Sequence, residues 1–330
     1  MILGAAARAR RFLHGAGLLH AARLPRPVVS IGNLAMGGTG KTPHAIHLAR
    51  WLAGQGRSVG VLSRGYGRSS RGVRWVSDGE GPIVPAAEGG DEPVLIARSL
   101  PGVPVVVGES RYDAGRELLS KRAVDLFLLD DGFQHLSLHR DLDLLLVECG
   151  RGLGNRMTAP LGFLREPPSH ARFADALVIT KYPDEESGRR CAASVPFPEG
   201  RPRAFTRFLS RGLVDRDGRP WSGAARGDEV FAFSGLARNG PFRDTLTAYG
   251  FRVKGFLPFP DHHGYARGDL DRIARGSEGL PVITTEKDLV RLPPDLPFPV
   301  GALRIEVEYL DGWEPISRRI LDLLDEGRRV

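Results

Sequence analysis

The chain has 330 residues, of which 42% are hydrophobic and 26% charged, with a formal net charge of +7. This composition suits a soluble protein of one large or two medium domains, and no apolar run reaches the roughly 18 residues of a membrane span. The excess charge is mostly arginine, which indicates an anionic partner such as phosphate groups, nucleic acid or an acidic membrane surface. Cys149 and Cys191 lack the spacing of metal ligands or of a disulfide framework, so we expect small buried hydrophobes in a reducing cytosol.

The N-terminal segment, residues 1–27, contains five arginines and no acidic residue. A helical wheel predicts an amphipathic helix that Pro25 and Pro27 end before the first strand. Such a helix either lies in a membrane interface or packs on the domain surface with solvated arginines. The predicted apolar face consists of Ala5, Ala9, Phe12, Leu13, Ala16 and Leu19.

A glycine-rich stretch between residues 28 and 52 predicts a nucleotide site. It reads as a short β-branched strand, a tight turn and an amphipathic helix that starts near Lys41. Glycines let successive N–H groups point at one anion, Lys41 and the helix N-terminus add positive charge, and Thr42 offers a hydroxyl to Mg²⁺. We expect a nucleoside triphosphate to bind this loop, which comprises Ala35, Met36, Gly37, Gly38, Thr39, Gly40, Lys41 and Thr42.

Apolar runs that alternate with helical segments predict an α/β fold. The expected architecture is a P-loop NTPase-like, doubly wound parallel sheet with a second, smaller α/β domain and the N-terminal amphipathic helix. Residues 183–227 are rich in Pro, Arg and Gly with weak periodicity, which indicates a linker. The expected parts are the helix 1–27, the P-loop domain 28–182, the boundary 183–227 and the C-terminal domain 228–330. Strands are expected at 58–65, 103–108, 142–148, 175–181 and 303–310, with further strands inside 123–135, 230–253 and 280–292.

Acidic residues follow an apolar strand in LFLLDDG (126–132). A strand that ends in Asp130 places a carboxylate beside the metal of a phosphoryl-transfer site, and Asp131 points in a different direction. One carboxylate can bind Mg²⁺ while the other positions water or a neighbouring side chain. Two solvated acids in a turn are the alternative.

Two further loops carry groups suited to proton transfer. Asp91 and Glu92 precede a helix, where acids are also favoured by the helix dipole. Asp261, His262 and His263 form a His-rich loop, and an imidazole paired to a carboxylate can take a proton from an alcohol. A surface turn is the alternative, and nothing local links Asp91 to His262.

With these segments in order, the chain resembles the tetraacyldisaccharide 4'-kinase family of Gram-negative bacteria over nearly its whole length. The glycine-rich motif is distinctive by itself, and the ordered series is highly specific. The series is SIGNLAMGGTGKTP (30–43), SRGYGR (63–68), GDEP (90–93), LLDDGFQH (128–135), LREP (164–167), FPDHHGY (259–265) and TTEKD (284–288).

The resemblance implies two P-loop-like α/β domains and an N-terminal helix that anchors the enzyme at the cytoplasmic face of the inner membrane, as a peripheral or monotopic protein. The implied reaction transfers the γ-phosphate of ATP, with Mg²⁺, to the 4'-hydroxyl of a tetraacylated glucosamine disaccharide 1-phosphate, a late step of lipid A biosynthesis. The implied partners are this glycolipid and an anionic membrane surface, without nucleic acid.

The resemblance also implies roles for individual residues. The catalytic group is Lys41, Asp91, Asp131 and His262. Metal ligands are Thr42, Asp130, Gln134 and Glu166, with His135 on the same strand end. Arg165 and Glu166 lie on the nucleotide side, and Tyr66, Glu92 and Arg111 lie near the substrate.

Two other functions use the same phosphate loop. A membrane-associated P-loop ATPase acting as a switch shares the loop, the metal site and the amphipathic helix, but does not need an acid–imidazole pair. A soluble P-loop kinase of a small metabolite shares the chemistry without the membrane.

Overall fold

A computed structural model describes residues 2–326 of the chain. Its framework is one 12-stranded sheet in the order β10-β9-β11-β12-β8-β7-β6-β1-β5-β2-β4-β3. Two pairings are antiparallel, β3 with β4 and β8 with β12, and the other pairings are parallel. The expected α/β class with a mostly parallel sheet is therefore confirmed, but the sheet is continuous where two separate domains were expected.

The first lobe surrounds β1 (Val28–Asn33), which lies between β5 (Leu126–Asp130) and β6 (Leu142–Glu148). All residues of β1 and β5 are buried, because helices cover both faces of the sheet. One face packs on α2 (Lys41–Gly54), α4 (Asp91–Ser99) and α10 (Trp313–Glu326), and the other on α5 (Arg111–Lys121) and α6 (Glu185–Ser194). The lobe is completed by β2 (Val59–Ser63), β3 (Arg74–Ser77), β4 (Val105–Val107), β7 (Ala176–Thr180), α3 (Ala86–Gly89) and the 3₁₀ turn η1 (Pro168–Phe173).

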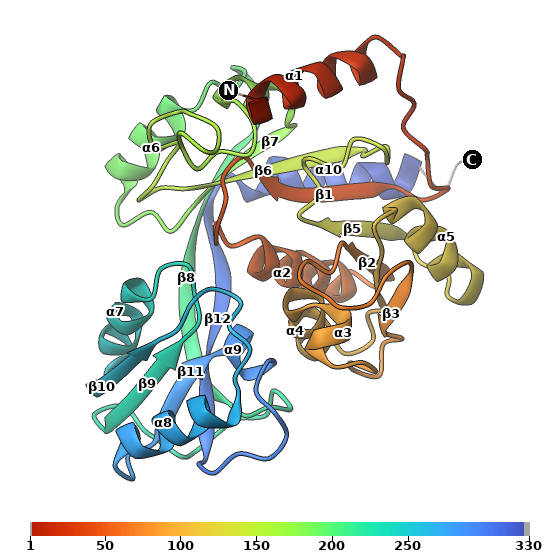
Figure 1. The fold of residues 1–330 in the computed structure, drawn as a ribbon. Helices are drawn as coiled ribbons and strands as arrows, with labels where there is room; N and C mark the ends of the chain where they lie inside the picture. The colour runs from red at the N-terminus through yellow and green to blue at the C-terminus, as the bar shows by residue number, and fades with distance from the viewer. Residues whose placement is uncertain (1, 327–330) are drawn as a thin grey trace.

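The second lobe lies at the other end of the sheet, below and to the left in Figure 1. Its strands are β9 (Glu229–Ser234), β10 (Arg252–Pro258) and β11 (Val282–Thr285), and its helices are α7 (Gly240–Tyr249), α8 (Arg267–Ser277) and α9 (Glu286–Leu289). Two long antiparallel strands, β8 (Arg203–Val214) and β12 (Val300–Asp311), run from one lobe into the other.

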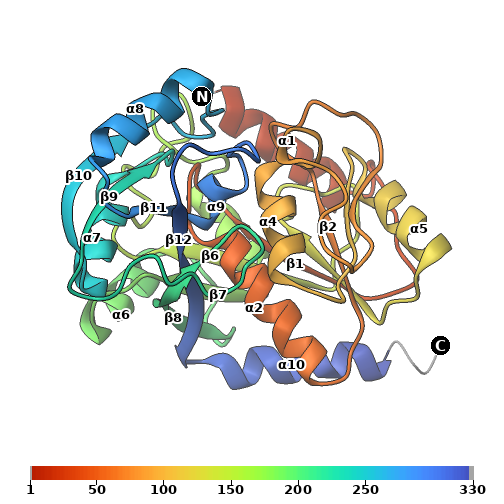
Figure 2. The same cartoon turned by 90° about the horizontal axis from the view of Figure 1, so that it is seen from below.

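The residues that make up each lobe differ from the division of the chain expected from composition. The expected linker, residues 183–227, contains α6 and β8. The C-terminal helix α10 leaves the second lobe and packs beside α2 (Figure 2), where the rings of Trp51 and Trp313 lie 5.0 Å apart. The arginine and proline content of residues 183–227 obscured the hydrophobic periodicity of α6 and β8. For α10, no local sequence pattern indicates which lobe the helix will pack against.

The N-terminal helix α1 (Ile2–Gly15) ends ten residues before Pro25, earlier than expected. Gly17 takes φ 72, a left-handed conformation that glycine adopts at little cost, and Leu18 donates its N–H to the carbonyl of Leu13. Within residues 2–326 no helix combines the length and apolar character needed to cross a membrane.

Candidate active site

The phosphate loop joins β1 to α2 in the expected strand–turn–helix order. Gly40 immediately precedes α2 with φ 94, and a Cβ there would lie 2.5 Å from a ring carbon of Phe208. Glycine is therefore required at this position by both conformation and space. Lys41 and Thr42 are buried in the first helical turn, whose N–H groups have no partners within the helix.

Donors outside the loop hold its carbonyl groups. Lys181 Nζ donates to the carbonyl of Gly38 at 2.9 Å, and Thr180 Oγ1 donates to that of Thr39 at 3.0 Å. An Arg151 guanidinium N–H donates to the carbonyl of Met36 at 3.0 Å. The N–H groups of Met36 and Thr39 donate to the carbonyls of Phe163 and Gly37, so the N–H groups left for an anion are chiefly those at the start of α2.

Asp131 follows β5 and faces the loop lysine. One carboxylate oxygen lies 3.7 Å from Lys41 Nζ, and the other accepts a hydrogen bond of 2.7 Å from Arg165. Burial would raise the pKa of Asp131, but the positive charges of Lys41 and Arg165 outweigh it and lower that pKa. Asp131 is therefore an ionised carboxylate that holds the side chains of Lys41 and Arg165 next to the phosphate loop.

Asp130, the last residue of β5, is only 1% exposed, and neither of its carboxylate oxygens has a hydrogen-bond partner. Burial, and then the negative charges of Glu92 and Asp131, raise its pKa to about 8. An ionised carboxylate in this position lacks a partner, and a bound cation would supply one.

The residues around Asp130 fit a magnesium ion. Residues 2–326 contain no cluster of three or more His, Cys, Asp or Glu side chains arranged to hold a metal by themselves. However, buried oxygens of Asp130, Asp131 and Gln134 have no hydrogen-bond partner. Mg²⁺ usually takes one or two protein carboxylates and completes its shell with water and phosphate oxygens, which this oxygen set allows.

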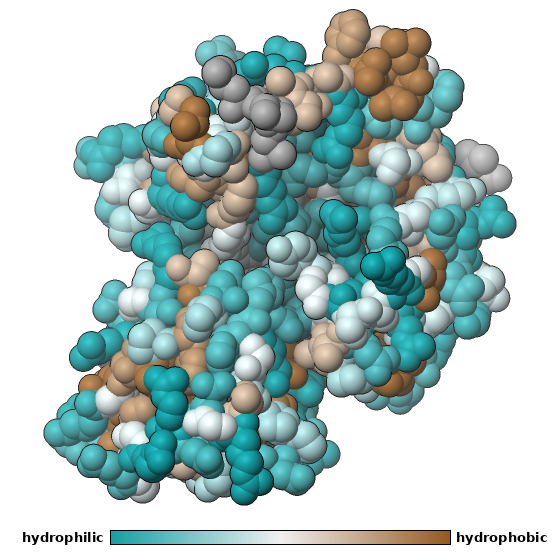
Figure 3. Space-filling view, in the orientation of Figure 1, coloured by the Kyte–Doolittle hydropathy of each residue, from teal (hydrophilic) through white to brown (hydrophobic). Residues whose placement is uncertain are grey.

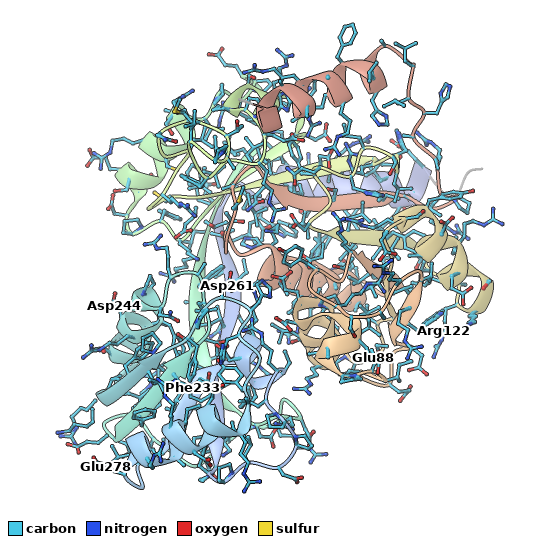
Figure 4. All side chains as sticks on the ribbon, viewed as in Figure 1. Glu88, Arg122, Phe233, Asp244, Asp261 and Glu278 are labelled. Atoms are coloured by element: carbon cyan, nitrogen blue, oxygen red, sulfur yellow. The ribbon has the colours of Figure 1, made fainter. Side chains whose placement is uncertain are left out.

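A second polar cluster connects the two lobes. Asp91 begins α4, and His262 lies between β10 and α8, on the loop whose Asp261 faces the first lobe in Figure 4. His262 Nδ1 lies 2.9 Å from Asp91 Oδ2, which also accepts a hydrogen bond of 2.6 Å from Arg291 Nε. Burial would raise the pKa of Asp91, but the bonds to His262 and Arg291 lower it.

Lys287 contacts both His262 and Glu92 in this cluster, whereas His263 lies outside it. Lys287 Nζ lies 3.2 Å from His262 Nε2 and 3.4 Å from a Glu92 carboxylate oxygen. His263 turns away and lies 2.9 Å from Asp269. The structure therefore brings His262, and not its neighbour, to Asp91, although the catalytic role of the pair stays a prediction.

Two residues expected near the substrate have different surroundings. The ring of Tyr66 lies 5.6 Å from that of His262. Arg111 is buried and donates to the carbonyl of Glu109, and burial, followed by the charge of Arg64, lowers its pKa to about 10. Their substrate roles stay predictions.

Glu166 does not join the nucleotide loop through any contact described in residues 2–326. It is buried and accepts hydrogen bonds of 2.9 and 2.8 Å from Arg11 of α1, and its Oε2 lies 3.0 Å from His170 Nδ1. The neighbouring Arg165 does reach Asp131. Metal or nucleotide binding by Glu166 stays a prediction.

Residues of the site that were not predicted include Lys181, Arg11 and Arg291, together with Thr180 and Arg151. Lys181 and Arg11 reach the loop and Glu166 only through the fold, and no local pattern distinguishes them from other basic residues. Arg291 follows Lys287 by four residues, a spacing that would place both on one face of the helix expected after TTEKD, although α9 ends at Leu289. That spacing was the one available signal for Arg291.

Replacing Asp130 with Asn should stabilise the metal-free protein at high pH. The raised pKa means that the folded protein keeps a proton which the unfolded chain has released, so wild-type stability falls as pH rises from about 4 to about 8. In EDTA, Asp130→Asn should match the wild-type Tm near pH 4 and exceed it by roughly 3 °C or more near pH 9. Added Mg²⁺ should raise the wild-type Tm at high pH and leave that of the variant nearly unchanged.

Asp244→Asn provides the matched control, because Asp244 is an exposed carboxylate on α7 (Figure 4). We expect its Tm to follow that of the wild type at each pH. Equal high-pH stability of Asp130→Asn and the wild type would contradict the assignment of Asp130 as an unsatisfied buried acid.

Comparison with known proteins places this geometry in one family. Residues 1–324 match the family model described as tetraacyldisaccharide-1-P 4'-kinase. A tetraacyldisaccharide 4'-kinase of Anaeromyxobacter dehalogenans strain 2CP-C is 44% identical over 325 residues, covering 95% of this chain and 86% of the relative. The enzyme of the same name from Geobacter sulfurreducens is 41% identical over 315 residues, covering 94% and 88%.

A solved structure shares the whole fold. LpxK from Aquifex aeolicus, crystallised in complex with ATP, superposes with a TM-score of 0.80 at 36% identity, and the match covers 98% of this chain and 96% of that one. This chain therefore shares its overall fold with that protein. The chain belongs to the tetraacyldisaccharide-1-P 4'-kinase family.

Proposed function

We propose that the protein transfers the γ-phosphate of ATP to the 4'-hydroxyl of a tetraacylated glucosamine disaccharide 1-phosphate, a step of lipid A biosynthesis. Family membership supports the acceptor, and the solved relative in complex with ATP supports the donor. The observation that carries the proposal is the meeting of two sites. In the first lobe a phosphate loop lies near buried oxygens of Asp130, Asp131 and Gln134 that have no hydrogen-bond partner. The Asp91–His262 pair connects this lobe to the second one.

The roles of the chain's own residues follow from their contacts. Lys41 stabilises negative charge on the transferred phosphoryl group, and Asp131 holds Lys41 and Arg165 in place. Thr42, Asp130 and Gln134 are the ligands available to Mg²⁺, which when bound would neutralise charge on the phosphate oxygens. Glu92 pairs with Lys287 at 3.4 Å, and we assign it to the substrate side of the site.

The proton of the acceptor hydroxyl passes to His262. With Nδ1 facing Asp91, the neutral ring carries its proton on Nδ1, and Nε2 is the accepting nitrogen. Lys287 Nζ lies 3.2 Å from Nε2, so the acceptor hydroxyl takes the place of this lysine contact. Arg291 Nε donates to the same Asp91 oxygen and fixes the carboxylate, which in turn orients the imidazole. Because Asp91 and His262 come from different lobes, we infer that lobe closure around the substrate completes the site.

The fold is a P-loop NTPase-like, doubly wound arrangement in the first lobe, with the smaller second lobe supplying the histidine. We infer that residues 28–182 and 228–299 move as two bodies. The ribbon of β8 and β12 is then the flexible connection between them.

A product assay tests the proposed reaction. Purified protein with labelled ATP, Mg²⁺ and the disaccharide lipid in detergent should yield a phosphorylated lipid, while ATP hydrolysis without the lipid should be negligible. Lys41→Ala should lose at least about tenfold in kcat, because it stabilises charge on the phosphoryl group. Rapid lipid-independent release of phosphate would favour an ATPase switch, and transfer to a small metabolite alone would favour a soluble kinase.

Asp91 and His262 should act as one unit. Asp91→Ala and His262→Ala should each lower kcat by roughly 10²- to 10⁴-fold, the range for a lost general base, with little change in ATP affinity. The double variant should be hardly slower than the slower single variant.

His263→Ala is the matched control, since this neighbouring imidazole contacts Asp269. Its kcat should stay within about twofold of the wild type. Multiplying losses in the double variant, or a damaging His263→Ala change, would contradict the pairing.

We further propose that α1 lies in the anionic interface at the cytoplasmic face of the inner membrane, as a peripheral contact. The predicted apolar face points outward, with Phe12 70% exposed, and Figure 3 shows hydrophobic side chains gathered at the end of α1. Arg8 and Arg10 are exposed beside this face. Other exposed hydrophobic side chains are Leu18 and Leu19 directly after α1, Met157 next to the Thr158 that lies against Gly4, and Phe173, whose ring lies beside Arg11.

Cosedimentation with vesicles tests the membrane contact. Changing Arg8 and Arg10 together to Met should weaken binding to anionic vesicles by about 2 kcal/mol, or roughly 30-fold, at about 1 kcal/mol for each basic residue. Binding to neutral vesicles should be weak for both proteins. Unchanged affinity for anionic vesicles would mean that the helix is only a structural part of the lobe.

A further inference from the structure

We propose that Arg11 is a positioning residue that couples the seating of α1 to the geometry of the nucleotide site. The inference rests on the proposed kinase function and on the proposed membrane contact of α1. Arg11 differs from the other arginines of the helix, because it is only 8% exposed while Arg8 and Arg10 are exposed. It lies on the face of Gly4 and Ala7, which points into the protein.

Arg11 makes a complete set of contacts inside the lobe. Its Nε and one terminal nitrogen donate to Glu166 Oε2 at 2.9 and 2.8 Å, and the same terminal nitrogen donates to the carbonyl of Phe133 at 3.1 Å. The guanidinium also lies 4.5 Å from the ring centre of Phe133 and 4.9 Å from that of Phe173. These contacts fix the direction of the planar guanidinium as well as its position.

Both segments that Arg11 holds carry residues of the nucleotide site. Phe133 is two residues after Asp131, and Glu166 directly follows Arg165, whose side chain bonds Asp131. The Glu166 segment is also joined to the phosphate loop, because the N–H of Arg165 donates to the carbonyl of Leu34 at 2.6 Å. One guanidinium therefore joins α1 to both sides of the Asp131–Arg165 contact.

The chemistry of this contact favours control of geometry over stability. A buried ion pair gains little net stability compared with a hydrophobic contact of the same volume. A helix that needed only to be attached could use the aliphatic and aromatic side chains already around Arg11. What Arg11 adds is a directional link, and displacements of about 1 Å at a phosphoryl-transfer site can cost roughly 100-fold in rate.

The consequence is that α1 has two faces with separate duties. Arg8 attracts the membrane, and Arg11 transmits the position of the helix to Asp131, Arg165 and Lys41. Arg10 lies between the two faces, because it is exposed and also lies 3.6 Å from Glu166 Oε1. Loss of Arg11 should therefore impair phosphoryl transfer without impairing membrane binding, and loss of Arg8 should do the opposite.

The test compares Arg11→Met with Arg8→Met, two equal changes three residues apart on one helix. With lipid acceptor dispersed in detergent, Arg11→Met should lower kcat by roughly 10- to 100-fold and change the KM for ATP by less than about threefold. Its affinity for anionic vesicles should stay within about twofold of the wild type. Arg8→Met should keep the wild-type kcat in detergent and lose about fivefold in vesicle affinity.

Arg11→Lys keeps the test sharp if Arg11→Met folds poorly, since it retains the charge but not the two-pronged bond to Glu166. The kcat of Arg11→Lys should lie between that of Arg11→Met and that of the wild type. Each protein is assayed well below its own Tm. Wild-type kcat in a folded Arg11→Met or Arg11→Lys protein would overturn the proposal. So would a loss of vesicle binding in Arg11→Met equal to that in Arg8→Met. If the wild-type protein itself fails to phosphorylate the lipid, the proposed function fails.

Discussion

Adjacent carboxylates at the end of a buried strand are the constraint on which the site depends. Asp131 has two cationic partners, and Asp130 has none within hydrogen-bond distance. The low dielectric of the strand end magnifies this difference, so one carboxylate holds cations of the protein, and the other is the carboxylate that the proposed metal site requires. The loop, the 164–167 segment and the first turn of α2 are all arranged around that asymmetry.

The continuous sheet explains how two lobes bring Asp91 and His262 into contact. Strands β8 and β12 pair along most of their length, which keeps the lobes in register while leaving them joined by only two strands. The polar cluster of Asp91, His262, Lys287 and Arg291 then provides the contact on the open side. The two lobes are thus connected by the β8–β12 strand pair on one side and by ion pairs, which can break, on the other. The lobe closure proposed above requires a connection of this kind.

The helix α1 reverses the usual orientation of an amphipathic helix on a globular protein. Ala5, Ala9 and Phe12 are exposed, while the buried residues opposite them are Gly4, Ala7 and Arg11. Burial of a charge is tolerated because Glu166 and two aromatic rings surround it. This exposed apolar area and the flanking arginines are the features on which the proposed membrane contact of α1 rests.

The sequence by itself determined the α/β class, the phosphate loop, the two acids after β5 and the His-rich loop, because each depends on short-range patterns of strands, turns and helix starts. It did not determine that β8 and β12 form one sheet, that α10 returns to the first lobe, or that α1 stops at Gly15. Nor could it choose His262 over His263, since both imidazoles share one loop and only the packing of the lobes decides which of them meets Asp91. The tertiary structure alone decided that Arg11 is buried and that Asp130 is left without a partner, because both depend on segments more than 30 residues apart coming together.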